Sequence, residues 1–193
     1  MILRAIKSVT LVELLISIVL IGLVILGLSN IELFCRNQLL SSERRLKVQN
    51  DASFVLEHMA KYVIRAVNRP GVDAVIFPTA DSFRVSVDVN RNGVLDEGPV
   101  NPDNWIAYSY DTNELRYCSN MSFSDPGNCE VAEETLSTHI NQADIIYDNT
   151  TNYLQVNITT CWDPDGNPEP CGSIKNPSIS LQSRIYLPSV STR

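Results

Sequence analysis

The feature that most constrains this chain is an apolar run near its start, which extends from Val9 to Leu28 and contains one charged residue, Glu13. A helix of this length is about 30 Å long, which matches the hydrocarbon core of a bilayer. The sequence therefore predicts a membrane-spanning helix over residues 9–28. A carboxylate inside such a helix costs on the order of 3 kcal/mol in lipid unless a cation pairs with it. Glu13 is therefore a candidate functional residue.

Two general interpretations of the apolar run compete. A secretory signal peptide has a shorter apolar core, followed by a cleavage site of the small-x-small type. Here the run is longer, and Gly27-Leu28-Ser29-Asn30 matches such a site poorly. An uncleaved single-pass anchor would explain the run but would give no role to Glu13. The residues before the run favour a third interpretation.

The junction between the basic start of the chain and the apolar run carries a more specific pattern, Lys7-Ser8-Val9-Thr10-Leu11-Val12-Glu13-Leu14. It resembles the leader junction of type IV pilins and type II secretion pseudopilins. In that family a short basic leader precedes an apolar residue, Thr, Leu, an aliphatic residue, Glu and Leu. The chain departs from the family at Ser8, where Gly is usual, and at Val9, where Phe is usual. Both changes keep the size and polarity class, so we expect slower processing of the same kind.

The resemblance implies a maturation route and a set of partners. Residues 1–8 would be a leader, a prepilin peptidase would cut between Ser8 and Val9, and the new amine of Val9 would be N-methylated. Thr10 and Glu13 would serve assembly, in which the helices of residues 9–28 pack with those of other pilins or pseudopilins in a helical filament. An assembly ATPase and its platform protein are the further partners implied. The strand order most resembles that of W-type minor pilins or the J-type minor pseudopilin.

The charge distribution indicates on which side of the membrane the larger part of the chain lies. Without Arg4 and Lys7 of the leader, 13 basic side chains face 22 acidic ones, for a sum of −9. This acidity argues against nucleic-acid binding. The basic leader places the C-terminal part outside the cytoplasm by the positive-inside rule. We expect a single-pass protein of the cytoplasmic (inner) membrane that then enters a filament in the periplasm or at the cell surface.

Helical periodicity continues beyond the apolar run. No Pro or Gly occurs between Ile31 and Val67. Apolar residues recur there at spacings of three and four, as on one face of a helix: Ala52, Val55, Leu56, Met59, Val63 and Ala66. The breaker cluster from Asn68 to Gly71 should end the helix. The sequence thus predicts one helix of nearly sixty residues, with an amphipathic second half over residues 29–69.

Residues 70–193 have the pattern of a β-rich domain. Apolar residues alternate with polar ones over residues 83–88, 154–158 and 179–187, as in strands with one buried face. Residues 106–110 and 115–117 flank Asp111-Thr112-Asn113-Glu114, which predicts a hairpin. The predicted fold class is therefore α+β, a long N-terminal helix packed on an antiparallel sheet in a pilin-like arrangement.

Four of the five cysteines form two closely spaced pairs, Cys118 with Cys129 and Cys161 with Cys171. Two local disulfides are the simplest pairing in an exported domain, although four cysteines allow three connectivities. Zinc would require closer cysteine pairs or added histidines. Cys35 has three roles open to it, as a packed thiol, an intersubunit partner or a lipid-attachment site, and we expect the packed thiol.

Oxygen-bearing side chains alternate before a turn glycine in residues 88–97. Their spacing is that of the first half of an EF-hand loop, with these ligands: Asp88, Asn90, Asn92, the carbonyl of Val94, and Asp96. The closing Glu of an EF-hand is missing, because Pro99 stands at its position. We expect one calcium ion of modest affinity, against the alternative of an Asn-Gly turn with solvated acids.

The sequence contains no recognisable catalytic constellation. His58 and His139 are isolated, and neither Gly-x-Ser-x-Gly nor His-Glu-x-x-His occurs. We therefore expect a structural subunit, a minor pilin or pseudopilin, in which the Val9 amine of one subunit pairs with Glu13 of a neighbour. The alternative is a membrane-tethered binding or sensor module with a calcium-stabilised domain that does not polymerise. Glu13 would then pair with its own amine or stay protonated.

Overall fold

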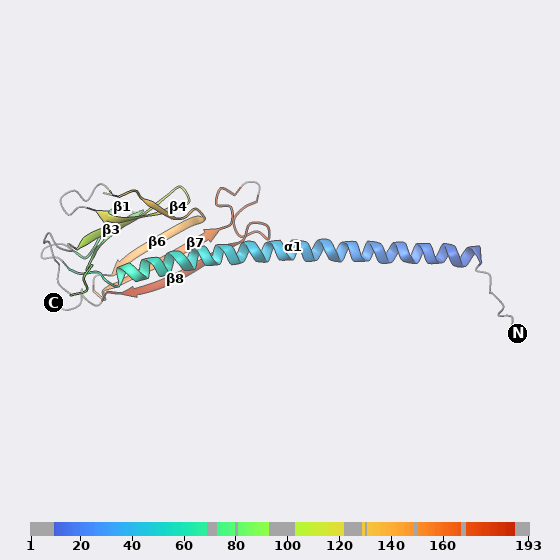
Figure 1. The fold of residues 1–193 in the computed structure, drawn as a ribbon, viewed down its shortest axis with the longest axis horizontal. Coiled ribbons are helices and arrows are strands. Elements are labelled where there is room, and N and C mark those ends of the chain that lie inside the picture. The colour runs from blue at the N-terminus through green and yellow to red at the C-terminus, as the bar shows by residue number, and fades with distance from the viewer. Residues whose placement is uncertain are drawn as a thin grey trace. The chain divides into compact units, whose positions relative to one another are not determined.

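One long helix precedes all the strands in the computed structural model, which describes residues 10–68, 73–79, 81–92, 103–121, 129, 131–148, 150–166 and 169–187. The chain divides into two compact units, one ending at Ser42 and the other beginning at Glu43. Helix α1 (Leu11–Val63) supplies residues to both units, and the strands of the second unit follow it (Figure 1). This order confirms the α+β class.

In the second unit, one face of α1 is buried. Five residues on this face are at most 1 % exposed: Val48, Ala52, Val55, Met59 and Val63. Their spacing of three and four residues places them on one side of the helix. The predicted apolar face is therefore confirmed, and it begins one turn earlier than predicted, at Val48. Leu56, which the periodicity included, is only partly buried.

The helix ends at Val63, about one turn before the predicted end at Asn68. Beyond Val63, two amides donate to carbonyls three positions back instead of four. The chain then pairs with a strand, because the amide of Val67 donates to the carbonyl of Ser86 at 2.9 Å. The predicted end was wrong because strand pairing, which helical periodicity does not record, takes over the backbone hydrogen bonds at this point.

The strands form two antiparallel sheets. The larger sheet contains, in chain order, β1 (Val75–Thr79), β2 (Ser82–Val87), β3 (Asn104–Asp111), β4 (Glu114–Met121) and β5 (Glu134–Ser137). The smaller sheet contains β6 (Ile140–Asp148), β7 (Tyr153–Cys161) and β8 (Ser178–Tyr186).

The sequence predicted a single sheet, and the division into two is a correction. Among the described residues, the ladder of strand pairing stops after β5 and restarts with β6 and β7. Ile140, the first residue of β6, is fully buried, and its amide donates to the carbonyl of Asn113 at 3.1 Å. The chain leaves the larger sheet there because burying Ile140 in the core and bonding its amide to the β3–β4 turn direct β6 away from β5.

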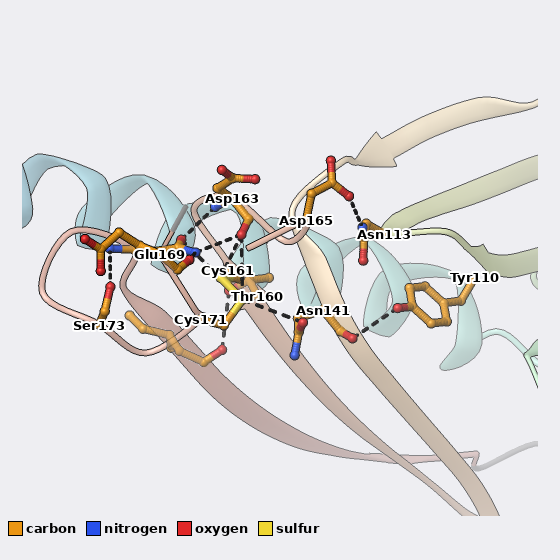
Figure 2. Close-up of a disulfide and its surroundings, with 12 residues drawn as sticks. Tyr110, Asn113, Asn141, Thr160, Cys161, Asp163, Asp165, Glu169, Cys171 and Ser173 are labelled. Carbon is orange, nitrogen blue, oxygen red and sulfur yellow. Dashed lines mark hydrogen bonds between the residues drawn. A yellow bond between two sulfur atoms is a disulfide. The ribbon is translucent and has the colours of Figure 1, made fainter. Parts of the chain in front are cut away.

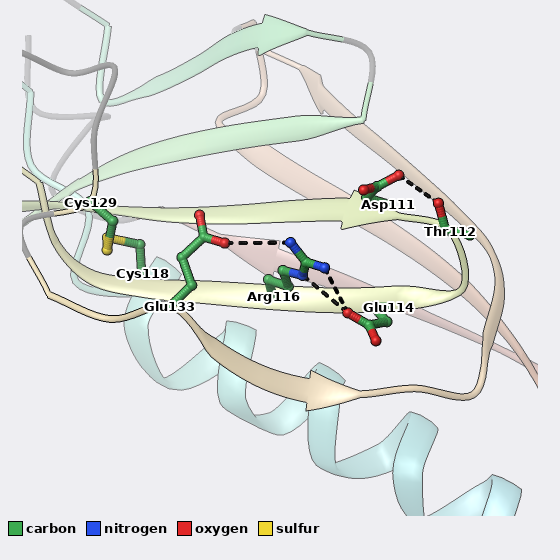
Figure 3. Close-up of polar contacts among 7 residues, drawn as sticks. All are labelled: Asp111, Thr112, Glu114, Arg116, Cys118, Cys129 and Glu133. Carbon is green, nitrogen blue, oxygen red and sulfur yellow. Dashed lines mark hydrogen bonds and ion pairs between the residues drawn. A yellow bond between two sulfur atoms is a disulfide. The ribbon is translucent and has the colours of Figure 1, made fainter.

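The predicted hairpin is present as β3 and β4, with Asp111 paired to Glu114. The turn residues Thr112 and Asn113 have φ angles of 44° and 69°, the two positive values that a type I′ turn requires. Asn tolerates this conformation, whereas a β-branched residue such as Thr rarely adopts it. The Thr112 hydroxyl donates to the Asp111 carboxylate at 2.8 Å (Figure 3). This local bond offsets part of the backbone strain.

The helix and both sheets share one hydrophobic core. Phe83 and Tyr108 of the larger sheet stack with ring centroids 4.9 Å apart. Leu154 and Ile158 of β7 come from the smaller sheet, and Met59 comes from α1; all three are buried. Within the second unit, the helix runs alongside β6, β7 and β8 (Figure 1). The buried face of α1 therefore joins two sheets that share no strand pairing among the described residues.

Replacing Met59 by Ala tests the role of this face. The side chain is fully buried, so Met59→Ala should lower the free energy of unfolding by about 2–5 kcal/mol, from lost burial and the cavity left behind. Leu46→Ala is the matched control, because Leu46 lies on the same helix and is 60 % exposed; it should cost less than about 0.5 kcal/mol. Denaturant unfolding of the detergent-solubilised protein measures both, and equal effects would contradict the core described above.

Candidate functional site

The first unit presents an apolar helix whose side chains are exposed on every side. All large apolar side chains from Leu11 to Leu28 are 52–81 % exposed. Mean hydropathy reaches 2.9 over an 18-residue window, and by length and composition α1 can cross a membrane. A helix that is apolar all round needs lipid or other protein to cover it. Of the predicted membrane helix, the structure confirms a helix that is long and apolar enough to span a membrane.

Thr10 and Glu13 form a reciprocal pair of hydrogen bonds at the start of α1. The amide of Thr10 donates to Oε2 of Glu13 at 3.1 Å, and the amide of Glu13 donates to the Thr10 hydroxyl oxygen at 3.3 Å. The Thr10 hydroxyl also lies 3.3 Å from Oε2. This arrangement is a capping box, with Thr10 at the N-cap and Glu13 at the third helical position.

The capping role of Glu13 was missed in the sequence, although its signal was present. A Thr followed three residues later by Glu, directly before an apolar run, is the pattern of a capping box. The box satisfies backbone donors that a helix end leaves unpaired, and the carboxylate also lies at the end of the helix that favours negative charge. Glu13 therefore has a local structural role, whatever it does between subunits.

The serine hydroxyls of the apolar helix are satisfied within it. Ser17 donates to the carbonyl of Glu13 at 2.8 Å, and Ser29 donates to the carbonyl of Ile25 at 2.9 Å. In each bond the serine hydroxyl donates to the carbonyl four residues earlier in the chain. The hydroxyl is therefore not left without a hydrogen-bond partner in an apolar environment. The predicted cleavage residues Ser8 and Val9 lie outside the described residues, so processing remains a prediction.

The predicted calcium ligands begin where β2 ends. Asp88 is buried, and its carboxylate accepts a bond from the amide of Arg91. The side-chain oxygen of Asn90 accepts the amide of Asn92 at 2.9 Å. Asp103, which sequence reasoning did not select, is also buried, and its carboxylate accepts the amide of Val89 at 2.8 Å.

The second half of the predicted calcium loop, with Val94 and Asp96, lies outside the described residues. Within the described part of the chain, no three or more His, Cys, Asp or Glu side chains are grouped as a metal site. The calcium ion therefore remains a prediction. The guanidinium group of Arg65 lies near the predicted ligands. It donates to the backbone carbonyl oxygens of Asp88 and Val89, with Nη2 at 2.8 Å from each.

Both predicted disulfides are present. Cys118 and Cys129 join β4 to the segment that follows it, with Cα atoms 5.9 Å apart (Figure 3). Cys161 and Cys171 close the loop after β7, with Cα atoms 5.8 Å apart (Figure 2). Trp105 packs near the first disulfide, in a small buried cluster with Cys118. The local pairing is therefore confirmed over the two alternative connectivities.

Cys35 is a free cysteine, and it is exposed. The expectation of a packed thiol was wrong, because residues 31–40 of α1 belong to the first unit and make no buried core there. Around Cys35, apolar residues occur on several sides of the helix. The sequence pattern alone does not distinguish a buried face from an exposed apolar face. An intersubunit or lipid role for Cys35 stays open.

His58, isolated in the sequence, lies among three tyrosines of the second unit. The Tyr117 ring is 4.6 Å away between centroids and the Tyr62 ring is 4.9 Å away. Nδ1 of His58 lies 3.2 Å from the hydroxyl oxygen of Tyr108. Burial lowers the pKa of His58, and the nearby ammonium of Lys61 adds to this, while the carboxylate of Glu134 acts in the opposite direction. Burial also raises the pKa of Tyr108, so this cluster favours neutral groups.

Comparison with known proteins gives no match to this chain among protein-family models, curated proteins or solved structures.

The lowered pKa of His58 predicts a specific pH dependence. Because the folded protein disfavours the imidazolium, protonation is easier in the unfolded chain, and stability should fall as pH drops below about 6.5, the ordinary pKa of His. The free energy of unfolding of the wild type should therefore decrease more between about pH 7.5 and pH 5.5 than that of His58→Gln, whose side chain does not titrate. Parallel pH profiles of the two proteins would contradict the prediction.

Proposed function

We propose that this chain is a structural subunit of a helical filament, a minor pilin of a type IV pilus or a pseudopilin of a type II secretion system. The observation that carries the proposal is an apolar helix, exposed on every side, that begins with the Thr10–Glu13 capping box. The same helix supplies the buried face of a disulfide-bonded α+β domain. The leader and junction of residues 1–14 add the resemblance to the family.

Physical chemistry explains why such a helix suits a subunit that leaves the membrane. Lipid tails are as apolar as leucine side chains, so exchanging lipid for a neighbouring helix has little hydrophobic cost. Close packing of many similar helices then provides the association, and a contact between two different faces propagates without closing. Assembly would need a prepilin peptidase, an assembly platform and its ATPase as partners.

Glu13 would fix the position of each new subunit. Cleavage after Ser8 would create an amine on Val9, with an ordinary pKa near 8, that is largely charged at neutral pH. The capping bonds within the described residues use Oε2 of Glu13, so Oε1 offers a second acceptor for the amine of a neighbouring subunit. In an apolar environment the two charges are costly alone and much less so together. A subunit in the wrong register would leave both unpaired.

Within the family that the junction resembles, an acidic domain larger than that of a typical major pilin favours a minor subunit over a bulk one. The runner-up is a membrane-tethered binding or sensor module that never polymerises, which would use the same helix as an anchor only. The two differ in their processing, because the filament subunit would begin at Val9 and the tether at Met1. They also differ in the role of the Glu13 carboxylate, which pairs with the amine of a neighbouring subunit only in the filament.

Two substitutions separate the charge of Glu13 from its capping role. Glu13→Gln keeps an acceptor for the capping box, in which Glu and Gln both serve, but loses the charge. We expect this variant to enter the membrane and to be cut after Ser8, as N-terminal sequencing from Val9 would show, but to incorporate into filaments at least about tenfold less than the wild type, for the loss of one paired charge.

Thr10→Ala is the matched control. It removes the hydroxyl that caps the helix and keeps the carboxylate of Glu13, so incorporation should stay within about fivefold of the wild type, given a cap worth about 1 kcal/mol. Sheared filaments, quantified by immunoblot against the membrane fraction, measure both variants. Normal incorporation of Glu13→Gln would remove the charge mechanism, and mature protein that begins at Met1 would favour the tether.

We further propose that the loop after β2 binds one calcium ion that stabilises the second unit. Asp88 and Asp103 are 5 % and 0 % exposed, and buried carboxylates with neighbouring amide oxygens form the donor set that hard cations prefer. From the described residues, Asp88, Asn90 and Asn92 would supply side-chain ligands. The bound ion would supply positive charge and cross-link the end of β2 to the loop.

Melting of the full-length protein in detergent tests this site. If 1 mM calcium is about tenfold above the dissociation constant, the melting temperature should rise by on the order of 3–6 °C over that with chelator. Asp88→Asn should abolish the rise, whereas Asp144→Asn, at an exposed acid of β6, should keep it. No rise in the wild type, or an undiminished rise in Asp88→Asn, would contradict the proposal.

A further inference from the structure

One side of α1 in the second unit makes polar contacts with residues that are distant in the sequence. Arg44, Lys47, Val48 and Asp51 lie at spacings of three, one and three residues, so they share one face of the helix. Their partners are His139, Thr160, Trp162 and Lys175. These eight residues are called the helix clamp below.

Trp162 is at the centre of the helix clamp. Nζ of Lys47 lies 4.9 Å from the centroid of the indole ring, and Cζ of Arg44 lies 5.6 Å from it, both within the range of cation–π attraction. His139 stacks on the same ring with centroids 6.0 Å apart. Its Nδ1 lies 2.7 Å from Oδ2 of Asp51. One indole ring is thus held between the helix and the link that joins β5 to β6.

Two further contacts fix the helix backbone and side chains to the loop. The hydroxyl of Thr160, which is fully buried, donates to the carbonyl of Val48 at 3.0 Å. The guanidinium of Arg44 donates to the carbonyl of Lys175. Thr160 and Trp162 flank Cys161, so the residue that forms the disulfide lies between two of the residues that hold the helix.

Asn176, five residues beyond Cys171, bridges residues near both ends of the loop that the Cys161–Cys171 disulfide closes. Asn176 is 2 % exposed. Its side-chain amide donates to the carbonyls of Asp163 and Glu169 at 2.9 and 2.8 Å, and its side-chain oxygen accepts the amide of Asp163 at 2.8 Å. These bonds require the two ends of the loop to be close, which the disulfide enforces.

The same loop reaches the larger sheet. The side-chain amide of Asn113, in the β3–β4 turn, donates to Oδ1 of Asp165 at 3.0 Å (Figure 2). The loop therefore contacts the helix, the larger sheet and, through β7 and β8, the smaller sheet.

We propose that closure of the Cys161–Cys171 disulfide locks residues 44–51 of α1 onto the sheets of the second unit, so that docking of this helix segment depends on oxidation. With the disulfide closed, the position of Trp162, next to Cys161, is fixed and the helix clamp forms. With the disulfide open, the loop no longer holds the indole ring, and this part of α1 opens more often. The inference concerns the second unit alone and does not depend on filament formation.

The opening step is a thiol–disulfide exchange with a dithiol. Cys161 is fully buried and Cys171 only partly, so a dithiol thiolate attacks Sγ of Cys171. The Cys161–Cys171 bond breaks, and Cys161 leaves as a thiolate that takes up a proton. The second thiol of the dithiol then attacks the mixed disulfide and releases Cys171 as a thiol. Two electrons and two protons pass to the protein, and the dithiol becomes a cyclic disulfide; an oxidant of the disulfide class reverses the step.

Amide hydrogen exchange of the full-length protein in detergent tests the proposal. In Cys161→Ala/Cys171→Ala, amides of residues 45–51 should exchange at least about tenfold faster than in the wild type, because the open loop no longer closes the helix clamp. Cys118→Ala/Cys129→Ala is the matched control; it removes the other disulfide and should leave these amides unchanged. Trp162→Leu, with its disulfide intact, should give the same tenfold rise.

Combining the substitutions distinguishes the helix clamp from general loosening. Adding Trp162→Leu to Cys161→Ala/Cys171→Ala should raise exchange at residues 45–51 no further, because both act through the same contacts. Unchanged exchange in Cys161→Ala/Cys171→Ala, or an equal rise in Cys118→Ala/Cys129→Ala, would overturn the proposal. Loss of protection in β3 and β4 of Cys161→Ala/Cys171→Ala as well would indicate global unfolding of that variant, and Trp162→Leu would then decide. Faster exchange confined to residues 45–51 in Trp162→Leu supports the helix clamp, and unchanged exchange there refutes it.

Discussion

The second unit depends on the burial of one helix face against two sheets. The larger and smaller sheets share no strand pairing in the described residues. Apart from single hydrogen bonds, such as that from Ile140 to Asn113, their association relies on side chains that both contact. Val55, Met59 and Val63 supply these from α1. Fully burying a side chain of this size contributes about 1.5–3 kcal/mol, which is large beside the net stability of an ordinary domain, about 5–15 kcal/mol. Without α1, both sheets would expose apolar side chains that the helix now covers.

The same helix meets two different requirements along its length. From Leu11 to Leu28 it is apolar on every side, so it needs cover all round, from lipid or from like helices. From Val48 to Val63 it is amphipathic, so its apolar face needs only its own domain. The residues between these parts include Arg44 and Lys47, whose cations lie over Trp162. The proposed function rests on this change of character within one helix, because a filament subunit must expose one part and keep the other buried.

Several polar groups at the ends of elements have short-range partners that could be mistaken for functional signals. Glu13 looks like an isolated acid in an apolar run, yet it completes a capping box with Thr10. Asp111 pairs with the hydroxyl of the strained turn residue Thr112. Asp88 and Asp103 accept backbone amides near the end of β2. In each case the group can make its local hydrogen bond and also interact with another molecule. Substitutions that keep the hydrogen bond and remove the charge distinguish the two roles.

The sequence by itself determined the features that depend on neighbours along the chain. Its apolar run, the spacing of Ala52 to Val63, the alternation in the strands, the β3–β4 hairpin and the two local disulfides follow from helical and strand periods and from short loops. Tertiary structure decided what depends on distant partners. The helix ends at Val63 because Val67 pairs with β2, and the strands divide because Ile140 enters the core. His58 and His139 acquire their neighbours from remote strands and helix turns. Periodicity records which face of an element is buried, but the identity of the partner that buries it is settled only when the chain folds.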